Sequence, residues 1–258
     1  KHECPPWTIK SKKVHHDKKK QTINYKDAWL RLYDFPVVYF PKFFHPDPTV
    51  KRKSGFLKPN ISNKKTLGTS FDLPYFHVID TDKDLTFKPR LYSDGKFILQ
   101  NEYRYVTKNS KHILDFGFIN RHKSNYKKRK NTKSHFFSNS LIDLNYNDLD
   151  ISNLEINLEK VSNDTYLKLF SLESALLEEK PSDLNSYLKL DLGNEKFDFI
   201  SKIEVYENLS GSNNDRYEYI LPEYSLTTNI ENDKINGTLS FSSSGNQKLF
   251  DTNVIESS

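Results

Sequence analysis

The stretch FILQNEYRYVTKNSKHILDFGF, residues 97–118, carries the pattern that decides the fold. Phe97, Leu99, Tyr103 and Tyr105 alternate with polar or charged residues, and the same alternation returns over residues 111–118. A period of two places one set of side chains on each face of a β-strand. The stretch therefore predicts two successive antiparallel strands.

The alternation repeats along most of the chain after residue 65. We count about eleven candidate strands, near residues 67–75, 84–92, 97–105, 111–118, 134–146, 154–159, 184–192, 197–205, 216–228, 234–243 and 247–255. Most are longer than the roughly five or six residues of an ordinary globular strand. Their length matches the roughly 9–11 residues that cross a bilayer at a tilt, which favours a transmembrane β-barrel.

Alternation is also typical of a soluble β-sandwich, because both folds have one apolar and one polar face. Successive hairpins and aromatic residues near the predicted strand ends favour the barrel. These aromatic residues are Tyr75, Phe76, Tyr92, Tyr103, Tyr105, Tyr217 and Tyr219. A general porin or solute channel and a soluble carbohydrate-binding β-protein remain alternatives.

The composition agrees with a strand-rich protein. Aromatic residues make up 14% of the chain and hydrophobic residues only 35%, a mixture that favours strands over helical cores. The formal charge of +5 does not by itself indicate nucleic-acid binding. No apolar run is long enough for a transmembrane helix. Because the chain begins at Lys1 and contains no Met, we expect a fragment or a processed piece.

The first part of the chain predicts a separate, smaller sheet. Short alternating runs on either side of a charged turn, residues 15–20, indicate a hairpin, and residues 34–40 form an apolar strand between Pro36 and Pro41. These prolines suit a sheet edge, because proline cannot donate to a ladder. The proline-rich segment 40–62 that follows indicates a boundary between two β-domains.

Two long connections interrupt the predicted hairpins. The first contains Tyr126 and the basic run Lys123, Lys127, Lys128, Arg129, Lys130 and Lys133, which we interpret as a charged loop rather than a binding site. The second, residues 162–183, contains an amphipathic run at 166–177 that predicts a short helix. If the strand beginning near residue 65 rises from the periplasm, counting strands puts both connections on the periplasmic side.

Nothing in the sequence indicates catalysis. We find no nucleophile elbow, Walker loop, G-x-G-x-x-G or H-E-x-x-H motif, so we expect no catalytic site and no cofactor. His15, His16 and Asp17 predict a solvated turn rather than a metal site. The single Cys4 permits no disulfide within this sequence.

Several motifs together resemble one protein family. They are CPPW at 4–7, PVVYFPKF at 36–43, KRKSGFLKPNIS at 51–62, LPYFHVIDTDKDLTFKPRLY at 73–92, LQNEYRY at 99–105, EINLEKVSNDTYLKLF at 155–170 and DRYEYILPEYSL at 215–226. In this order and spacing they resemble the LptD family, also called OstA or Imp, of outer-membrane lipopolysaccharide-assembly proteins. The resemblance runs from about residue 4 to residue 228, and periodicity alone supports the strands beyond it.

The resemblance implies an all-β fold in two parts. Residues 1–53 would be the last strands of a periplasmic, OstA-like β-jelly roll, and residues 54–64 a junction. Residues 65–258 would be the first part of a large, incomplete antiparallel barrel in the bacterial outer membrane. The implied function is non-enzymatic: the family inserts lipopolysaccharide into the outer leaflet. Lipid A leaves through a lateral gate near the first barrel strands, while the sugars pass through the lumen.

The resemblance also implies partners and site residues. The partners are lipopolysaccharide, an LptE-like plug lipoprotein in the lumen and LptA-like jelly-roll bridge proteins, with no nucleic acid. Pro74 and Pro89 match prolines beside the lateral gate, and each removes one N–H from a predicted strand. Cys4 is a candidate for an interdomain disulfide with a cysteine outside this sequence.

The junction is the third implied site. Its residues are Lys51, Arg52, Lys53, Ser54, Gly55, Phe56 and Leu57. The first three carry positive charge that would attract lipid phosphates. A solvated loop without a ligand is the alternative interpretation.

Overall fold

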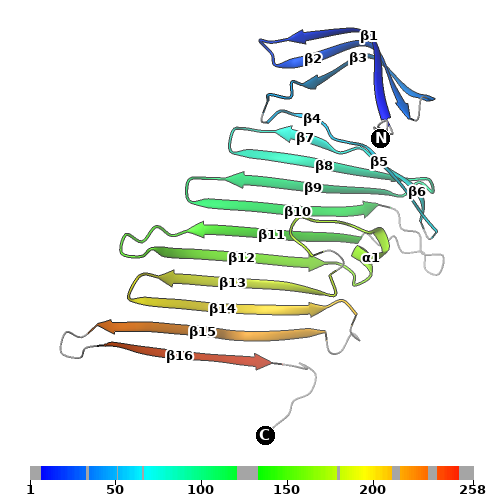
Figure 1. Cartoon of the computed structure of the whole chain (residues 1–258). Helices are drawn as coiled ribbons and strands as arrows, with labels where there is room; N and C mark the ends of the chain where they lie inside the picture. The colour runs from blue at the N-terminus through cyan, green and yellow to red at the C-terminus, as the bar shows by residue number, and fades with distance from the viewer. Residues whose placement is uncertain are drawn as a thin grey trace, which may run out of the picture. The chain divides into compact units, whose positions relative to one another are not determined.

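The computed structural model describes residues 7–32, 35–50, 52–65, 67–120, 133–178, 181–210, 216–231 and 237–249. These residues form antiparallel strands with one short helix, so the prediction of an all-β fold is confirmed (Figure 1). The chain divides into two compact units. Unit 1 holds residues 1–57 and 75–78, and unit 2 holds residues 58–74 and 79–258.

Unit 1 contains a three-stranded antiparallel sheet in the order β1 (Trp7–Asp17), β2 (Thr22–Leu32) and β3 (Phe35–Pro46). The predicted hairpin is confirmed, and its turn is tighter than expected. Asp17 Oδ1 accepts the backbone N–H groups of Lys19 and Lys20 at 3.1 and 3.0 Å, so that β1 continues through the histidines. Next to this sheet in the sequence, β4 (Gly55–Phe56) pairs with β7 (Tyr75–Val78).

Proline placement explains why β3 lies at the edge of its sheet. The strand contains Pro36, Pro41 and Pro46, and it runs past the predicted end at Phe40. An edge strand tolerates prolines because half of its backbone groups have no ladder partner to lose.

Unit 2 contains one long antiparallel sheet. Its strands are β5 (Asn60–Lys64), β6 (Gly68–Asp72), β8 (Lys83–Tyr92), β9 (Phe97–Val106), β10 (Ser110–Asn120), β11 (Lys133–Asp143), β12 (Ile151–Val161), β13 (Asp183–Gly193), β14 (Phe197–Asn208), β15 (Tyr217–Glu231) and β16 (Thr238–Leu249). From β8 to β16 each strand pairs with the next in sequence, whereas β6 pairs with β8 and not with β7, and the order from β16 to β5 does not close on itself within the described residues. The prediction of long successive hairpins is confirmed.

Two local predictions need correction. The strand β5 lies in the segment that we interpreted as a connection, where it pairs with β6. At the other end, one continuous strand, β16, replaces the two predicted at 234–243 and 247–255. Gly245 lies within this strand opposite Tyr224, and a Cβ at Gly245 would lie 2.9 Å from the Tyr224 ring. Residues 250–258 lie outside the described part of the chain.

The two ends of the long sheet differ in their connections. Residues 79–82, 107–109, 144–150 and 194–196 make short turns at the end where β5 begins. At the opposite end, β10 finishes and β11 begins on either side of residues that the structure does not describe, and β12 is followed by a longer connection, described over residues 162–178 and 181–182. This longer connection contains α1 (Tyr166–Phe170), so the predicted helix is confirmed.

The basic run at 123–130 lies outside the described residues, although Lys133 is described and donates to Asn163 Oδ1 at 3.2 Å. Across the described ranges, no helix has the length and apolar character needed to cross a membrane.

Candidate functional site

One face of the long sheet in unit 2 is apolar and exposed. The strand registers place large side chains from successive strands on this face, 36% to 57% exposed. They are Phe71, Phe87, Leu91, Phe116, Phe118, Phe136, Leu158, Leu188, Ile203, Tyr224, Leu239 and Phe241. Exposed apolar surface costs about 25 cal/mol per Å² relative to burial. We call this surface the apolar face, and its extent indicates contact with lipid or a partner.

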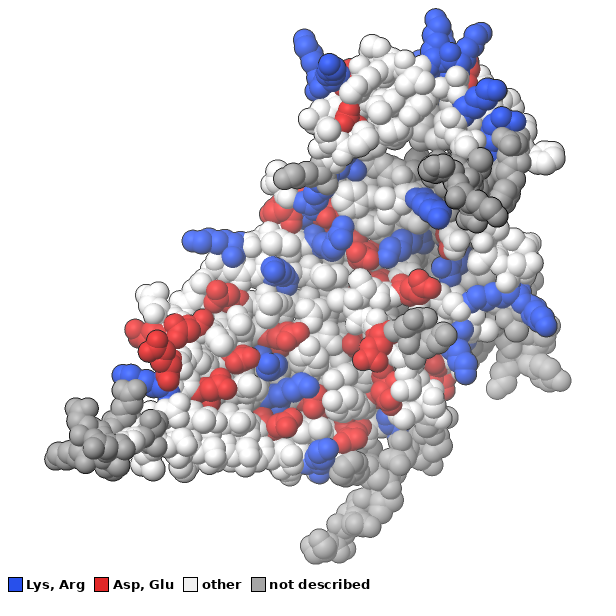
Figure 2. All heavy atoms as spheres, in the orientation of Figure 1, with Lys and Arg blue, Asp and Glu red and all other residues white. Residues whose placement is uncertain are grey.

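The opposite face, the polar face, carries ion pairs that join neighbouring strands. They are Arg90 Nε to Asp72 Oδ1, Lys88 Nζ to Glu102 Oε2 and Arg104 Nε to Asp84 Oδ1, each at 2.8 Å. The three carboxylates are only 5% to 13% exposed, so pairing supplies the stabilisation that water would otherwise give. Figure 2 shows acidic and basic side chains interspersed over the sheet. The long sheet therefore has one charged face and one apolar face.

Asp115 is the centre of a buried polar network on this face. Gln100 Nε2 donates to its two carboxylate oxygens at 3.1 and 2.8 Å, and His135 Nε2 lies 3.1 Å from Oδ1. On its other side, His135 Nδ1 lies 3.2 Å from the Tyr166 hydroxyl. Burial raises the pKa of Tyr166, so its hydroxyl stays protonated and can donate to His135. The network joins β9, β10, β11 and α1.

Residues 162–178, which we call the strap, lie against the polar face. Arg90 Nη1 donates to the Phe170 carbonyl at 2.8 Å, and Gln100 Nε2 donates to the Glu173 carbonyl at 2.9 Å. Lys64 Nζ contacts the Ser171 hydroxyl. The Arg90 contact places a cation at the end of α1, where carbonyl groups lack helical partners.

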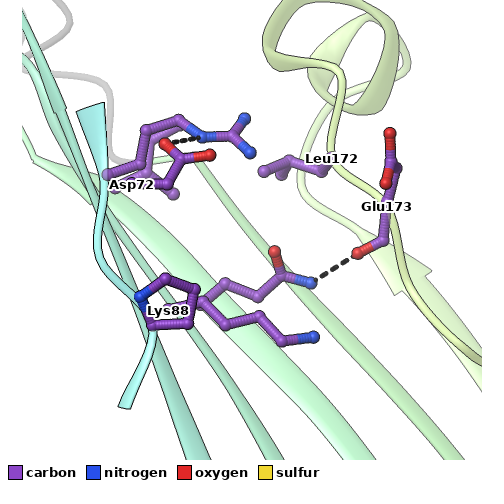
Figure 3. A pocket seen from close by; sticks show the side chains of 8 residues that line it. Asp72, Lys88, Leu172 and Glu173 are labelled. Carbon is purple, nitrogen blue, oxygen red and sulfur yellow. Dashed lines mark hydrogen bonds and ion pairs between the residues drawn. The ribbon is translucent and has the colours of Figure 1, made fainter. Parts of the chain in front are cut away.

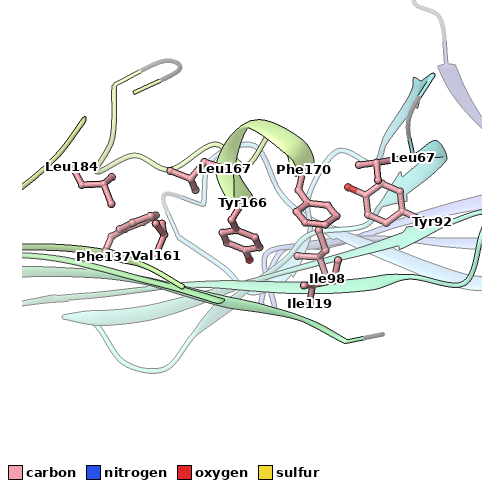
Figure 4. Packing of buried hydrophobic residues seen from close by; sticks show 10 residues of the cluster. All are labelled: Leu67, Tyr92, Ile98, Ile119, Phe137, Val161, Tyr166, Leu167, Phe170 and Leu184. Carbon is pink, nitrogen blue, oxygen red and sulfur yellow. The ribbon is translucent and has the colours of Figure 1, made fainter. Parts of the chain in front are cut away.

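An apolar cluster beneath α1 completes the attachment of the strap. Tyr166 and Phe170 are fully buried, and their rings lie in a T-shaped arrangement with centroids 5.6 Å apart. The remaining members are Leu67, Tyr92, Ile98, Ile119, Phe137, Val161, Leu167 and Leu184 (Figure 4). Because these residues come from the strap and from several strands, the strap is part of the folded core.

We expect Gly117→Ala to destabilise the protein by about 1–3 kcal/mol through overpacking. A Cβ at Gly117 would lie 2.7 Å from His135 Cε1 and 2.8 Å from the Leu99 carbonyl oxygen. The backbone oxygen cannot move away without breaking the ladder between β9 and β10. Urea unfolding in detergent micelles measures the loss. Gly237→Ala, where the new Cβ would have no neighbour within 4 Å, is the matched control, and equal midpoints for both variants would contradict this packing.

The two predicted gate prolines lie next to the edge of the long sheet. The strand β6 ends at Asp72, and Pro74 follows before the next strand begins at Tyr75. The Leu73 N–H donates to the Pro89 carbonyl at 3.3 Å. In an antiparallel pair, such residues exchange two hydrogen bonds. Pro89 has no N–H to return, so this position keeps one bond of two.

A cavity of about 230 Å³ opens beside Pro74. Its lining comes from Asp72, Pro74, Lys88, Arg90, Ile98, Gln100, Leu172 and Glu173 (Figure 3). The strap thus covers polar-face residues directly next to the weakened strand pair. In the described part of the chain, no group of three His, Cys, Asp or Glu side chains could hold a metal ion.

Residues 54–57 of the predicted junction belong to unit 1. Ser54 Oγ accepts the Val78 N–H at 2.8 Å, and the Phe56 ring packs 5.0 Å from Tyr75. Lys53 Nζ donates to the carbonyl oxygens of residues 20 and 21. The side chains of Phe56 and Leu57 are 64% and 46% exposed. Cys4 and Lys51 lie outside the described residues.

Sequence reasoning missed the buried network on the polar face. Gln100, Asp115, His135 and Tyr166 lie far apart in the chain and were not chosen as candidates. The sequence contains one indication of this network: Gln100 and Asp115 occupy polar positions in the alternating pattern of two adjacent predicted strands. The pairing of Gly117 with Gln100 and His135 brings these side chains together.

Comparisons with known proteins agree on one family. A family model described as LptD protein matches residues 23–166. The chain is 30% identical to an LPS-assembly protein LptD of Pseudoalteromonas translucida over 64% of this chain and 21% of that protein. It is 27% identical to one from Legionella pneumophila (69% and 22%) and 25% identical to one from Idiomarina loihiensis (88% and 28%). The chain therefore spans between 21% and 28% of the length of these relatives.

Proposed function

The chain belongs to the LptD family, and on that premise we propose that it forms part of an outer-membrane translocon for lipopolysaccharide. Its role is non-enzymatic: it conducts the glycolipid from the periplasm and releases it into the outer leaflet. The sugars pass along the polar face, and the lipid leaves at the strand edge near Pro74 and Pro89.

The observation that carries this proposal is the reversed polarity of the long sheet. Its exposed face holds Phe and Leu, while its charged residues are buried and paired on the other face. A soluble sheet would bury the apolar face instead. Strands of 10 to 15 residues, from β8 to β16, are long enough to cross a bilayer at a tilt. The apolar face then contacts lipid, and the polar face lines a hydrated lumen.

The edge near β6 supports a lateral exit. A lipid can leave a barrel sideways only where two strands separate, because elsewhere the ladder is continuous. Only Ser70, Phe71 and Asp72 of β6 pair in register with β8, whereas β9 and β10 pair along almost their full length. With Pro89 unable to donate, the pairing of β6 with β8 is weaker than that of β9 with β10.

Location and partners follow from the same proposal. Residues 1–53 lie in the periplasm as the end of a jelly roll, residues 54–59 form a shortened junction, and the membrane barrel begins at β5. The strand β5 starts on the periplasmic side, so short turns face the periplasm and the connections 121–132 and 162–182 face outward, as in other outer-membrane barrels. This replaces the periplasmic assignment of these connections, which began the strand count at residue 65.

An LptE-like plug lipoprotein and LptA-like bridge proteins are the proposed protein partners. Cys4 is proposed to bridge to a cysteine elsewhere in the complete protein. Arg52 and Lys53, near the junction, supply positive charge for lipid phosphates.

Site-specific photocrosslinking in the complete protein tests the proposal. A probe is placed in turn at Phe40, Phe56, Leu73 and Phe87, and adducts are detected by blotting for lipopolysaccharide. We expect adducts at Phe40 and Leu73, and none at Lys108, an exposed residue in the short turn after β9. Absence of adducts at all four positions in folded, membrane-inserted protein would favour a porin. Extraction without detergent would favour a soluble carbohydrate-binding protein.

A further inference from the structure

A second hollow, of about 660 Å³, lies on the polar face away from the prolines. Its floor comes from β11 to β14, and residues 175–178 of the strap form one wall. Side chains that define it include Asn139, Asn157, Glu159, Asn185, Tyr187 and Tyr206. We call it the amide groove. It shares no lining residue with the cavity beside Pro74.

Hydrogen bonds hold the amides of the groove in fixed positions. Asn139 Nδ2 donates to Glu155 Oε1 at 3.0 Å and to Asn157 Oδ1 at 3.3 Å. Asn157 Nδ2 donates to Glu159 Oε1 at 2.9 Å and to the Asn185 carbonyl at 2.8 Å. The donors of the floor are therefore engaged within the protein, while carboxylate and amide oxygens retain free lone pairs. A ligand that fits this floor must bring donors.

One acceptor in the groove lacks a partner. Asn185 Oδ1 is buried and has no hydrogen bond in the described structure, although the backbone N–H of Asn185 donates to Glu159 Oε2 at 2.8 Å. A buried acceptor left without a donor costs about 1–3 kcal/mol. The floor of the groove therefore keeps an excess of acceptors over donors.

The charge of the groove selects between ligand classes. Its described lining includes the carboxylates Glu159, Glu178 and Asp183, and no Lys, Arg or His. A phosphate group would meet three carboxylates there, and the nearby Lys202 is already paired with Glu204. The cavity beside Pro74 differs, because Lys88 and Arg90 line it. The amide groove thus favours hydroxyl groups over phosphates.

Aromatic rings supply the remaining recognition. Tyr187 and Tyr206 both line the groove. Lys202 Nζ covers one side of the Tyr187 ring at 4.7 Å from its centroid, and the Tyr187 hydroxyl donates to Glu155 Oε1 at 2.7 Å. Fixed amides, free carboxylate oxygens and a flat ring together match a sugar ring, which has hydroxyl donors at its rim and C–H groups on its faces.

We propose that the amide groove binds uncharged, hydroxyl-rich sugar residues of the transported glycolipid. The proposal rests on the proposed function and adds a ligand preference to it. The groove holds the unphosphorylated part of the oligosaccharide, so the sugar chain has a defined resting position within the lumen. Phosphorylated sugars are disfavoured there by the three carboxylates.

Calorimetric titration of the complete protein in detergent micelles tests the groove. The probes are a delipidated lipopolysaccharide oligosaccharide and the same oligosaccharide after enzymatic removal of phosphate. We expect the dephosphorylated form to bind more tightly. Tyr206→Ala should weaken its binding about five- to tenfold, the size of effect that aromatic contacts give. Glu178→Gln removes one negative charge, so it should reduce the difference in affinity between the phosphorylated and dephosphorylated oligosaccharides.

Tyr146→Ala is the matched control, since Tyr146 is 58% exposed in the turn between β11 and β12. The affinity of Tyr146→Ala for the dephosphorylated oligosaccharide should stay within about twofold of that of the unmodified protein. Urea midpoints establish that each variant is folded. Tighter binding of the phosphorylated form, no binding of either, or equal losses in both Tyr variants would overturn the proposal. If lipopolysaccharide still crosslinks at Phe40 and Leu73, the translocon stands and only the groove fails. If the oligosaccharide binds but lipopolysaccharide gives no crosslinks at Phe40 and Leu73, the groove stands and the translocon proposal fails.

Discussion

Asp115→Ala is expected to lower the free energy of unfolding by about 3–5 kcal/mol, because it leaves the buried Gln100 and His135 side chains without their acceptor, at about 1–3 kcal/mol for each group. The substitution removes the acceptor for Gln100 and His135, whose contacts to Asp115 lie between 2.8 and 3.1 Å. The side chains of His135 and Asp115 are 0% and 1% exposed, so water cannot replace the lost bonds. The strap loosens as well, because Gln100 and Tyr166 are members of the same network.

Urea unfolding of the complete protein in micelles measures this loss. Asp94→Ala is the control: Asp94 pairs with Lys96 in a turn, its side chain is 42% exposed, and such a pair contributes at most about 1 kcal/mol. The loss of unfolding free energy in Asp115→Asn should lie between those of Asp115→Ala and Asp94→Ala, because the amide oxygen of Asn still accepts a hydrogen bond. If Asp115→Ala is no less stable than Asp94→Ala, the network does not hold the polar face together.

The double variant Pro74→Ala, Pro89→Ala is expected to slow release of lipopolysaccharide to the cell surface about tenfold or more. An alanine at position 89 can donate to the Leu73 carbonyl and complete the pair that now holds one hydrogen bond. An alanine at position 74 restores a donor and frees Leu73 from the restriction that a following proline imposes. Each new bond contributes about 0.5–1.5 kcal/mol against opening, and 1.4 kcal/mol corresponds to a factor of ten.

Pulse-labelling of lipopolysaccharide, followed by its appearance at the surface, measures this delay. Pro48→Ala is the control, since Pro48 is exposed in a turn of unit 1. Each single variant should show part of the delay. Delivery at the unmodified rate by the folded double variant would remove the gate assignment from both prolines.

The strands were predictable where a local pattern determines them. Period-two alternation is a property of a few consecutive residues, and it located β8 to β15 from the sequence. The strand β5, NISNK, has Ile61 as its single apolar residue and pairs with β6, and one apolar residue is too few to give a period-two pattern. The strand β16 runs through Gly245 while paired with β15, a relation between strands that the local sequence does not show. Residues 242–246, SSSGN, have the composition of a turn.

The candidate sites divide in the same way. Pro74 and Pro89 could be chosen because proline lacks a backbone N–H wherever it occurs. The family resemblance then assigned these two prolines to the lateral gate. The partners of Asp115 could not be chosen, because they depend on register. Sliding one strand by a single residue would send Asp115 to the apolar face. The side that each residue occupies was therefore predictable, and its specific partner was not.

The strap sets an order on how the molecule can assemble. Most strands of the long sheet pair with the next strand in sequence, so most pairings close a short loop at modest entropic cost. The bonds from Arg90 to Phe170 and from Gln100 to Glu173 span 80 and 73 residues. Their donors reach their final positions only after β8 and β9 have paired. Docking of the strap is thus a late step. Because its bonds need Arg90 and Gln100 in their native positions, the strap docks on a sheet in native register and not on one whose strands have slipped.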